Sequence, residues 1–257
     1  MGTKTVVFIH GMYMTPLCWE QWTERFQAQG YRTLAPAWPG RDRSVKELQT
    51  PDSKLGKLNL TDILDHLTKQ IQSLDEKPIL IGHSMGGLAT QILHNRGLAS
   101  AAIAIDSAPP AGVFTTEFSF LKANWGHVTP FANPNSPVVM TFERFQYAFV
   151  NGMSLDEQRA AFERYVVPES RAIPRQSLTS AAKIDFKKEH APLLIIAGGN
   201  DHIIPSSLCR TNYEKYKASP STTDFKEFAG RNHFLLGQKN WEEIADYCMD
   251  WISKKGS

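Results

Sequence analysis

The chain has 257 residues, 42% of them hydrophobic and 21% charged, and this length allows one sizeable core in a single α/β domain. Its 28 basic and 26 acidic residues are interspersed and give a net charge of +2, so we expect no nucleic-acid partner, which would need a basic stripe to contact the phosphates. Three widely spaced cysteines predict neither a disulfide framework nor a metal site, and no apolar run is long enough for a signal peptide or a membrane span. We expect a cytoplasmic protein, either a monomer or a homodimer.

Apolar, strand-like segments recur along the chain. They lie at residues 4–10, 31–37, 78–83, 101–106, 192–198 and 223–229. Apolar residues at helical spacing occur between or after them, at residues 60–74, 206–218 and 240–255. Because the strands are almost wholly apolar rather than alternating, both faces of the sheet should be covered. The pattern predicts an α/β fold, a doubly wound, mostly parallel sheet of about six strands with helices on both faces.

One interval breaks the alternation of strands and helices. Residues 107–190 contain no convincing strand and instead carry helical patterns, one of which opens with a capping box of Ser154 and Glu157 and stops before a proline. We therefore expect a helical cap insertion at 107–190 that divides the α/β core into two parts, 1–106 and 191–257.

The third strand-like segment leads directly into "GHSMG", a G-x-S-x-G pattern that ends a buried strand and begins a helix. A serine on so sharp a turn has a strained backbone, and side chains two residues before or after it would collide, which explains Gly82 and Gly86. The turn exposes the Ser84 hydroxyl, and the free N–H groups of the helix point toward the same place. Ser84 is therefore the candidate nucleophile.

A serine nucleophile needs a base, and the base needs a carboxylate to orient it. In this kind of sheet the order along the chain is nucleophile, acid, base, and Asp201 follows the fifth strand-like segment. Only two histidines come after it, and His202 is too close in sequence to bridge Asp201 and Ser84. His233 is left as the base. Asp106, which ends the fourth segment, competes with Asp201 as the acid.

The loop after the first strand should complete an oxyanion hole. In "FIHGM", Gly11 permits a close turn, so the backbone N–H groups of Met12 and Met85 are the expected donors. We interpret His10 as support for this loop rather than as a catalytic group.

Four motifs, "HGMYM", "GHSMGG", "GGNDHIIP" and "NHF", together resemble the α/β-hydrolase superfamily of serine esterases and lipases, in its order and across nearly the whole chain. The resemblance implies a mostly parallel sheet, a triad of Ser84, Asp201 and His233, an oxyanion hole at Met12 and Met85, no metal and no organic cofactor. The first loop is similar to plant methylesterases and hydroxynitrile lyases. The surroundings of the serine are similar to bacterial esterases and cofactor-free haloperoxidases.

The expected function is hydrolysis of a carboxylic ester of a small to medium, largely apolar substrate through an acyl-enzyme on Ser84. Two alternatives stay open: a lyase or perhydrolase that uses the same triad, and a small-molecule receptor that turns over slowly. Aromatic residues of the first loop and of the insertion are the candidates for substrate binding, namely Tyr13, Phe114, Trp125, Phe145 and Phe149.

Overall fold

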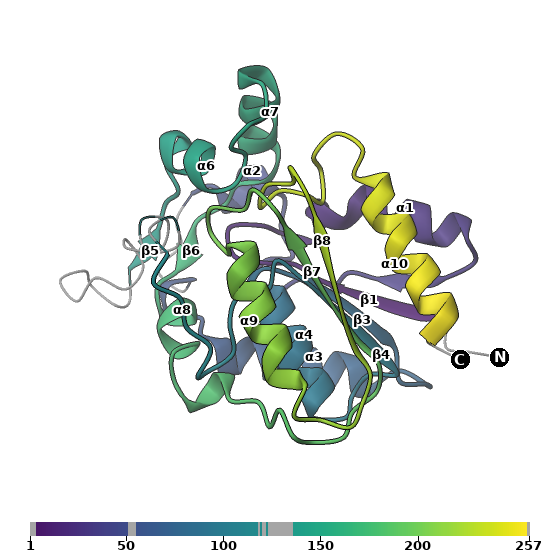
Figure 1. Ribbon diagram of the computed structural model, residues 1–257. Helices are drawn as coiled ribbons and strands as arrows, with labels where there is room; N and C mark the ends of the chain where they lie inside the picture. The colour runs from purple at the N-terminus through teal and green to yellow at the C-terminus, as the bar shows by residue number, and fades with distance from the viewer. Residues whose placement is uncertain (1–3, 51–54, 118, 120–121, 123–135, 256–257) are drawn as a thin grey trace.

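The computed structural model describes residues 4–50, 55–117, 119, 122 and 136–255 (Figure 1). A six-stranded sheet with the strand order β2-β1-β3-β4-β7-β8 forms its centre, and every neighbouring pair is parallel. The strands are β1 (Thr5–Ile9), β2 (Arg32–Leu34), β3 (Ile79–His83), β4 (Ala101–Ile105), β7 (Leu193–Gly198) and β8 (Thr223–Phe228). The predicted α/β fold with a mostly parallel six-stranded sheet is confirmed.

The four inner strands are completely buried, and the two edge strands are not. An edge strand pairs on one side only, so β2 and β8 carry charged side chains, whereas the inner strands are continuous apolar runs. The second predicted segment, 31–37, is shorter in the structure because only three of its residues pair with β1.

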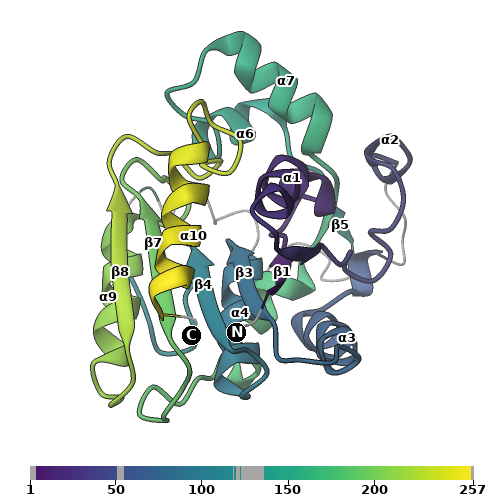
Figure 2. The same ribbon diagram turned by 90° about the vertical axis from the view of Figure 1, so that its right-hand side faces the viewer.

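Helices cover both faces of the sheet (Figures 1 and 2). One face carries α1 (Glu20–Ala28) and α10 (Glu242–Lys255), and the other carries α3 (Leu60–Gln72), α4 (Met85–Asn95) and α9 (Ser206–Tyr216). On α3 the buried side chains recur at helical spacing, at Leu60, Ile63, Leu64, Leu67 and Ile71. The apolar stripe predicted there faces the core. None of the helices in the described residues is long and apolar enough to cross a membrane.

Among the described residues, several short elements separate β4 from β7. They are β5 (Pro137–Val138), α6 (Phe142–Ala148), α7 (Leu155–Tyr165), β6 (Glu169–Ser170), α8 (Ala172–Gln176) and a 3-10 turn at Ser180–Ala182. The predicted capping box begins α7, and β5 and β6 form an antiparallel pair too short to be predicted from periodicity. In Figure 2, α6 and α7 lie beyond the carboxyl ends of the sheet strands, where loops meet in parallel sheets.

The remaining elements are short and flank the first part of the sheet. They are a 3-10 turn at Pro16–Trp19, the helix α2 (Val45–Leu48) and a second 3-10 turn at Leu55–Lys57.

Candidate active site

Ser84 occupies the sharp turn between β3 and α4. Its backbone has φ 57° and ψ −121°, a combination that residues other than glycine rarely adopt. Two hydrogen bonds hold it there: the Ser84 N–H donates to the Ile105 carbonyl at 2.9 Å, and the Ala108 N–H donates to the Ser84 carbonyl at 2.9 Å. A Cβ at Gly82 would lie 2.2 Å from the Gly86 carbonyl oxygen, and a Cβ at Gly86 would lie 2.2 Å from the Ile9 oxygen. The strain is therefore imposed by close backbone packing.

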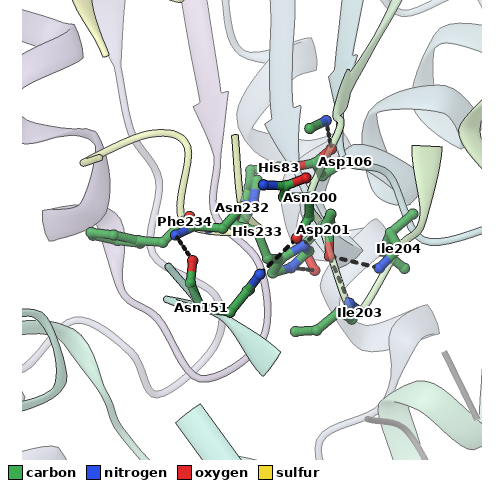
Figure 3. A network of polar contacts seen from close by, with 12 residues as sticks. His83, Asp106, Asn151, Asn200, Asp201, Ile203, Ile204, Asn232, His233 and Phe234 are labelled. Atoms are coloured by element: carbon green, nitrogen blue, oxygen red, sulfur yellow. Dashed lines mark hydrogen bonds and ion pairs between the residues drawn. The ribbon is translucent and has the colours of Figure 1, made fainter. Parts of the chain in front are cut away.

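A continuous series of hydrogen bonds leads from Ser84 to a buried carboxylate. Ser84 Oγ lies 3.0 Å from His233 Nε2, and His233 Nδ1 lies 2.5 Å from Asp201 Oδ2. The other Asp201 oxygen accepts the N–H groups of Ile203 and Ile204, at 2.6 and 2.9 Å (Figure 3). Because a carboxylate only accepts hydrogen bonds, Nδ1 carries the proton and Nε2 is free to accept the serine proton.

Asp106, the competing carboxyl, lies near this series but makes a different bond. Its Oδ1 accepts the Gly198 N–H at 2.6 Å, and its backbone has φ 40°. Burial, and then the nearby charge of Asp201, raise the pKa of the Asp106 carboxyl well above its usual range. The structure joins Asp201, and not Asp106, to His233.

His83, the residue before the serine, supports the loop that carries His233. Its Nε2 donates to the His233 carbonyl at 2.8 Å, and burial, with the neighbouring His233, lowers its pKa, so the ring stays neutral. In the sequence His83 is only the variable residue before the serine, and no pattern there indicates its hydrogen-bond partner. Ligating atoms of His83, Asp106 and His233 lie within 4.8 Å of one another. Both His233 nitrogens already bind Asp201 and Ser84, so we assign no metal to this group.

The loop after β1 lies directly against the serine. A Cβ at Gly11 would be 2.8 Å from Ser84 Cβ, so only a glycine allows this approach. Met12 and Met85 are buried, and none of the hydrogen bonds found among the described residues uses either N–H. His10 holds the loop from behind: Nδ1 donates to the Gly11 carbonyl at 2.9 Å, and burial lowers the pKa of the ring to about 3.

One of the predicted aromatic residues, Phe149, lies beside His233, and two others pack against Phe149. The Phe149 ring lies 5.0 Å from the His233 ring and 6.3 Å from the Tyr13 ring, edge-on to both. Phe145 stacks on Phe149 at 5.1 Å, and all three aromatic side chains are buried. Phe114 is 77% exposed, so it is not among the residues that the structure gathers here. Trp125 lies outside the described residues.

The insertion contacts the loops of both His233 and Asp201, which the sequence did not indicate. Asn232 Nδ2 donates to the Asn151 carbonyl at 3.0 Å, and Asn151 Nδ2 donates to the Asn200 carbonyl at 2.9 Å (Figure 3). The Phe234 N–H donates to the Phe149 carbonyl at 3.0 Å. The short segment after α6 therefore holds the ends of the two loops that carry Asp201 and His233.

A separate pocket of about 400 Å³ lies on the side of the first loops and α3. Its lining includes Pro39, Arg43, Leu48, Leu58 and Asp62, and none of Ser84, Asp201 and His233. Because none of the three hydrogen-bonded groups lines this pocket, we assign it no part in the chemistry.

Comparisons with known proteins agree with this fold. Three of the solved structures that match have TM-scores of 0.69 to 0.73. A monoacylglycerol lipase of Paleococcus ferrophilus is 20% identical (TM-score 0.70), over 99% of this chain and 97% of its own. Polyneuridine aldehyde esterase is 18% identical (0.69), over 97% and 99%. A variant of tomato methylketone synthase I, complexed with β-ketoheptanoate, is 16% identical (0.73), over 99% and 100%.

At these identities the likeness shows the fold alone. A comparison with curated protein sequences found no match. The sequence model described as "Alpha/beta hydrolase family", in contrast, matches residues 6–247, which is nearly the whole chain. By this match, the chain belongs to the alpha/beta hydrolase family.

Proposed function

We propose that this protein hydrolyses carboxylic esters of small to medium, largely apolar compounds, with Ser84 as the nucleophile. The observation that carries the proposal is the pair of hydrogen bonds from Ser84 Oγ to His233 Nε2, at 3.0 Å, and from His233 Nδ1 to Asp201, at 2.5 Å. A serine hydroxyl, an imidazole and a carboxylate in this order form the standard arrangement for acyl transfer. Membership of a hydrolase family supports the same reaction class.

In the first half of the reaction, Ser84 Oγ attacks the ester carbonyl carbon while His233 Nε2 takes the hydroxyl proton. Asp201 stabilises the imidazolium that forms, because its charge lies beside Nδ1. When the tetrahedral intermediate collapses, the bond to the alcohol breaks and His233 returns the proton to the leaving oxygen. The acyl group remains bound to Ser84 Oγ.

In the second half, His233 takes a proton from water as the water oxygen attacks the acyl-enzyme. Collapse of the second intermediate releases the carboxylic acid and returns the proton to Ser84. In both halves the carbonyl oxygen gains negative charge, for which the N–H groups of Met12 and Met85 are the proposed donors. Two observations support these donors: Gly11 lies against Ser84, and neither N–H has another hydrogen-bond partner among the described residues.

We also propose that residues 107–190 act as a cap over these groups. Two observations support the cap: α6 and α7 lie beyond the carboxyl ends of the strands, and Phe149 and Asn151 contact the His233 loop. Phe149 lies against the base, and both Tyr13 and Phe145 pack against Phe149, so Phe149 and Tyr13 are the proposed apolar contacts of the substrate.

The test is covalent labelling followed by turnover. A fluorophosphonate should add once to the parent protein, as measured by intact mass, and should not add to Ser84→Ala. The same variant should lose hydrolysis of p-nitrophenyl esters by about 10³-fold or more while its thermal midpoint stays within a few degrees of the parent. Ser253→Ala, at an exposed serine of α10, is the matched control and should label and hydrolyse as the parent does.

Two outcomes contradict the proposal. Labelling or ester turnover that persists in Ser84→Ala would show that another residue is the nucleophile. Carbon–carbon cleavage by the parent, with no acyl-enzyme of the expected mass on Ser84, would favour a lyase.

A further inference from the structure

A buried ion pair joins the insertion to the first half of the chain. Arg41 and Glu169 are each at most 1% exposed, and an Arg41 terminal nitrogen lies 2.7 Å from Glu169 Oε1. Glu169 belongs to β6, which is drawn beside β5 in Figure 1, and Arg41 follows β2. A buried ion pair adds little net stability, because desolvation offsets the attraction, so its effect on neighbouring groups is of more interest than its energy.

The second oxygen of Glu169 binds the loop that lies against Ser84. Glu169 Oε2 accepts the Tyr13 N–H at 3.0 Å, and the Val167 N–H donates to the Tyr13 carbonyl at 3.0 Å. Tyr13 has φ 63°, a left-handed conformation that is unfavourable for a bulky aromatic residue. Such a conformation persists only when surrounding groups hold it, and two neighbouring residues of the insertion supply two of the bonds that do so.

Tyr13 directly follows Met12, the proposed oxyanion donor of the β1 loop. At the other end of this short loop, Gly11 is fixed against Ser84. The position of the Met12 N–H therefore depends on both anchors, Gly11 on the side of the serine and Tyr13 on the side of Glu169. A shift of about 1 Å in such a donor is enough to lower catalysis by one to two orders of magnitude.

We infer that Glu169, held in place by Arg41, is a positioning residue that fixes the Met12–Tyr13 segment for stabilisation of the oxyanion. This inference rests on the proposed function, in which Met12 is a donor. It also gives the insertion a second role, because a carboxylate from residues 107–190 determines the geometry of a loop of the core. Loss of the acceptor should weaken binding of the tetrahedral intermediate and leave binding of the planar ester unchanged.

The experiment compares three paired variants in which no buried charge is left alone, so that folding is retained. All contain Arg41→Met. Glu169→Gln keeps an oxygen at the right reach for the Tyr13 N–H, Glu169→Asn keeps the amide but is one methylene shorter, and Glu169→Leu has no acceptor. Titration with the fluorophosphonate counts the active sites in each preparation, so that kcat refers to folded protein only.

We expect the glutamine pair to retain a kcat at least about tenfold higher than the leucine and asparagine pairs, with KM values that agree within about twofold. A trifluoromethyl ketone, which adds to Ser84 to give a tetrahedral oxyanion, should lose affinity in the same order and by a similar factor. A merely structural role would lower the thermal midpoint without this division between kcat and KM.

Equal kcat values in the glutamine and asparagine pairs would overturn the inference, as would a loss that appears only in KM. If the variant with Glu169→Leu does not fold, the comparison of the asparagine variant with the glutamine variant tests the inference alone, because the two side chains have the same polarity and differ only in length. Failure of the proposed function is a different result: the parent protein itself would neither label nor hydrolyse esters. A parent that does both, with three equal pairs, leaves the proposed function intact.

Discussion

Two buried carboxyl groups lie side by side near His233, and their hydrogen bonds give them different chemistry. Asp201 accepts two backbone N–H groups and the His233 ring, which stabilise a carboxylate. Asp106 accepts one N–H, from Gly198, and burial with the charge of Asp201 raises its pKa. Asp106 therefore keeps its proton to a higher pH than an exposed aspartate does. Asparagine is also neutral, so it should replace Asp106 with a smaller effect than it has at Asp201.

Asp201→Asn should lower kcat for ester hydrolysis by about 10³- to 10⁴-fold, because an amide beside Nδ1 favours the wrong tautomer of His233. Asp106→Asn, the matched control, should stay within about threefold of the parent. Steady-state kinetics at pH 7.5 measures both. The opposite order, with the larger loss in Asp106→Asn, would make Asp106 the acid.

At the scale of elements, the turn between β3 and α4 depends on how closely α4 approaches β1. Gly86 in the first turn of α4 lies so near β1 that an added Cβ would be 2.2 Å from the Ile9 oxygen and 2.4 Å from the His10 oxygen. Neither atom can move away easily, because both belong to the backbone. Helix α4 must shift away from β1 to accept any side chain at this position.

Gly86→Ala should therefore lower the free energy of unfolding by about 2–4 kcal/mol and move Ser84 away from the β1 loop, with a loss of ester turnover of at least about tenfold. Gly97→Asn is the control at the other end of the same helix. Gly97 has φ 78° with open space around it, and asparagine tolerates this conformation, so the cost should be below about 1 kcal/mol. Urea unfolding and kinetics measure both variants, and equal effects would show that the close contact is unimportant.

At the scale of the whole molecule, buried histidines link stability to pH. Burial lowers the pKa of His10 to about 3, of His94 to about 4, and of His83 well below its usual range. In the unfolded chain a histidine titrates near 6.5, so between about pH 4 and 6.5 the unfolded state binds protons that the folded state excludes. Stability from these groups is complete above pH 6.5 and is lost as the pH falls. Asp106 acts in the opposite direction, because its pKa is raised.

Three histidines with lowered pKa values outnumber the one carboxyl with a raised pKa, so the free energy of unfolding should fall between pH 7 and pH 5. His94 alone, with a pKa of about 4 in the folded state against 6.5 in the unfolded chain, should contribute about 2 kcal/mol to that fall. Urea midpoints at several pH values measure this fall. His94→Gln, outside the site, removes one of the three groups and should reduce the histidine contribution by about a third. A stability that does not change over this range would contradict the argument.

Features that depend on residues close together in the chain could be predicted without the structure. Six apolar segments predicted the six strands of the sheet, the periodicity of residues 60–74 predicted the buried face of α3, and the glycines around Ser84 predicted the sharp turn. These are local, because strand and helix periodicity and turn sterics act over a few residues. The two-residue strands β5 and β6 were not predicted, since they are too short to show a period.

Which distant groups meet became known only from the folded chain. It joined Asp201 rather than Asp106 to His233, it placed Phe149 against His233 while Phe114 is exposed, and it brought Glu169 to Tyr13 across 156 residues of sequence. Such contacts follow from how segments distant in sequence pack together at the carboxyl ends of the parallel strands, and no periodicity along the chain records that packing. The sequence therefore determined the strands and the serine turn, and the packing of distant segments determined the surroundings in which that serine would act.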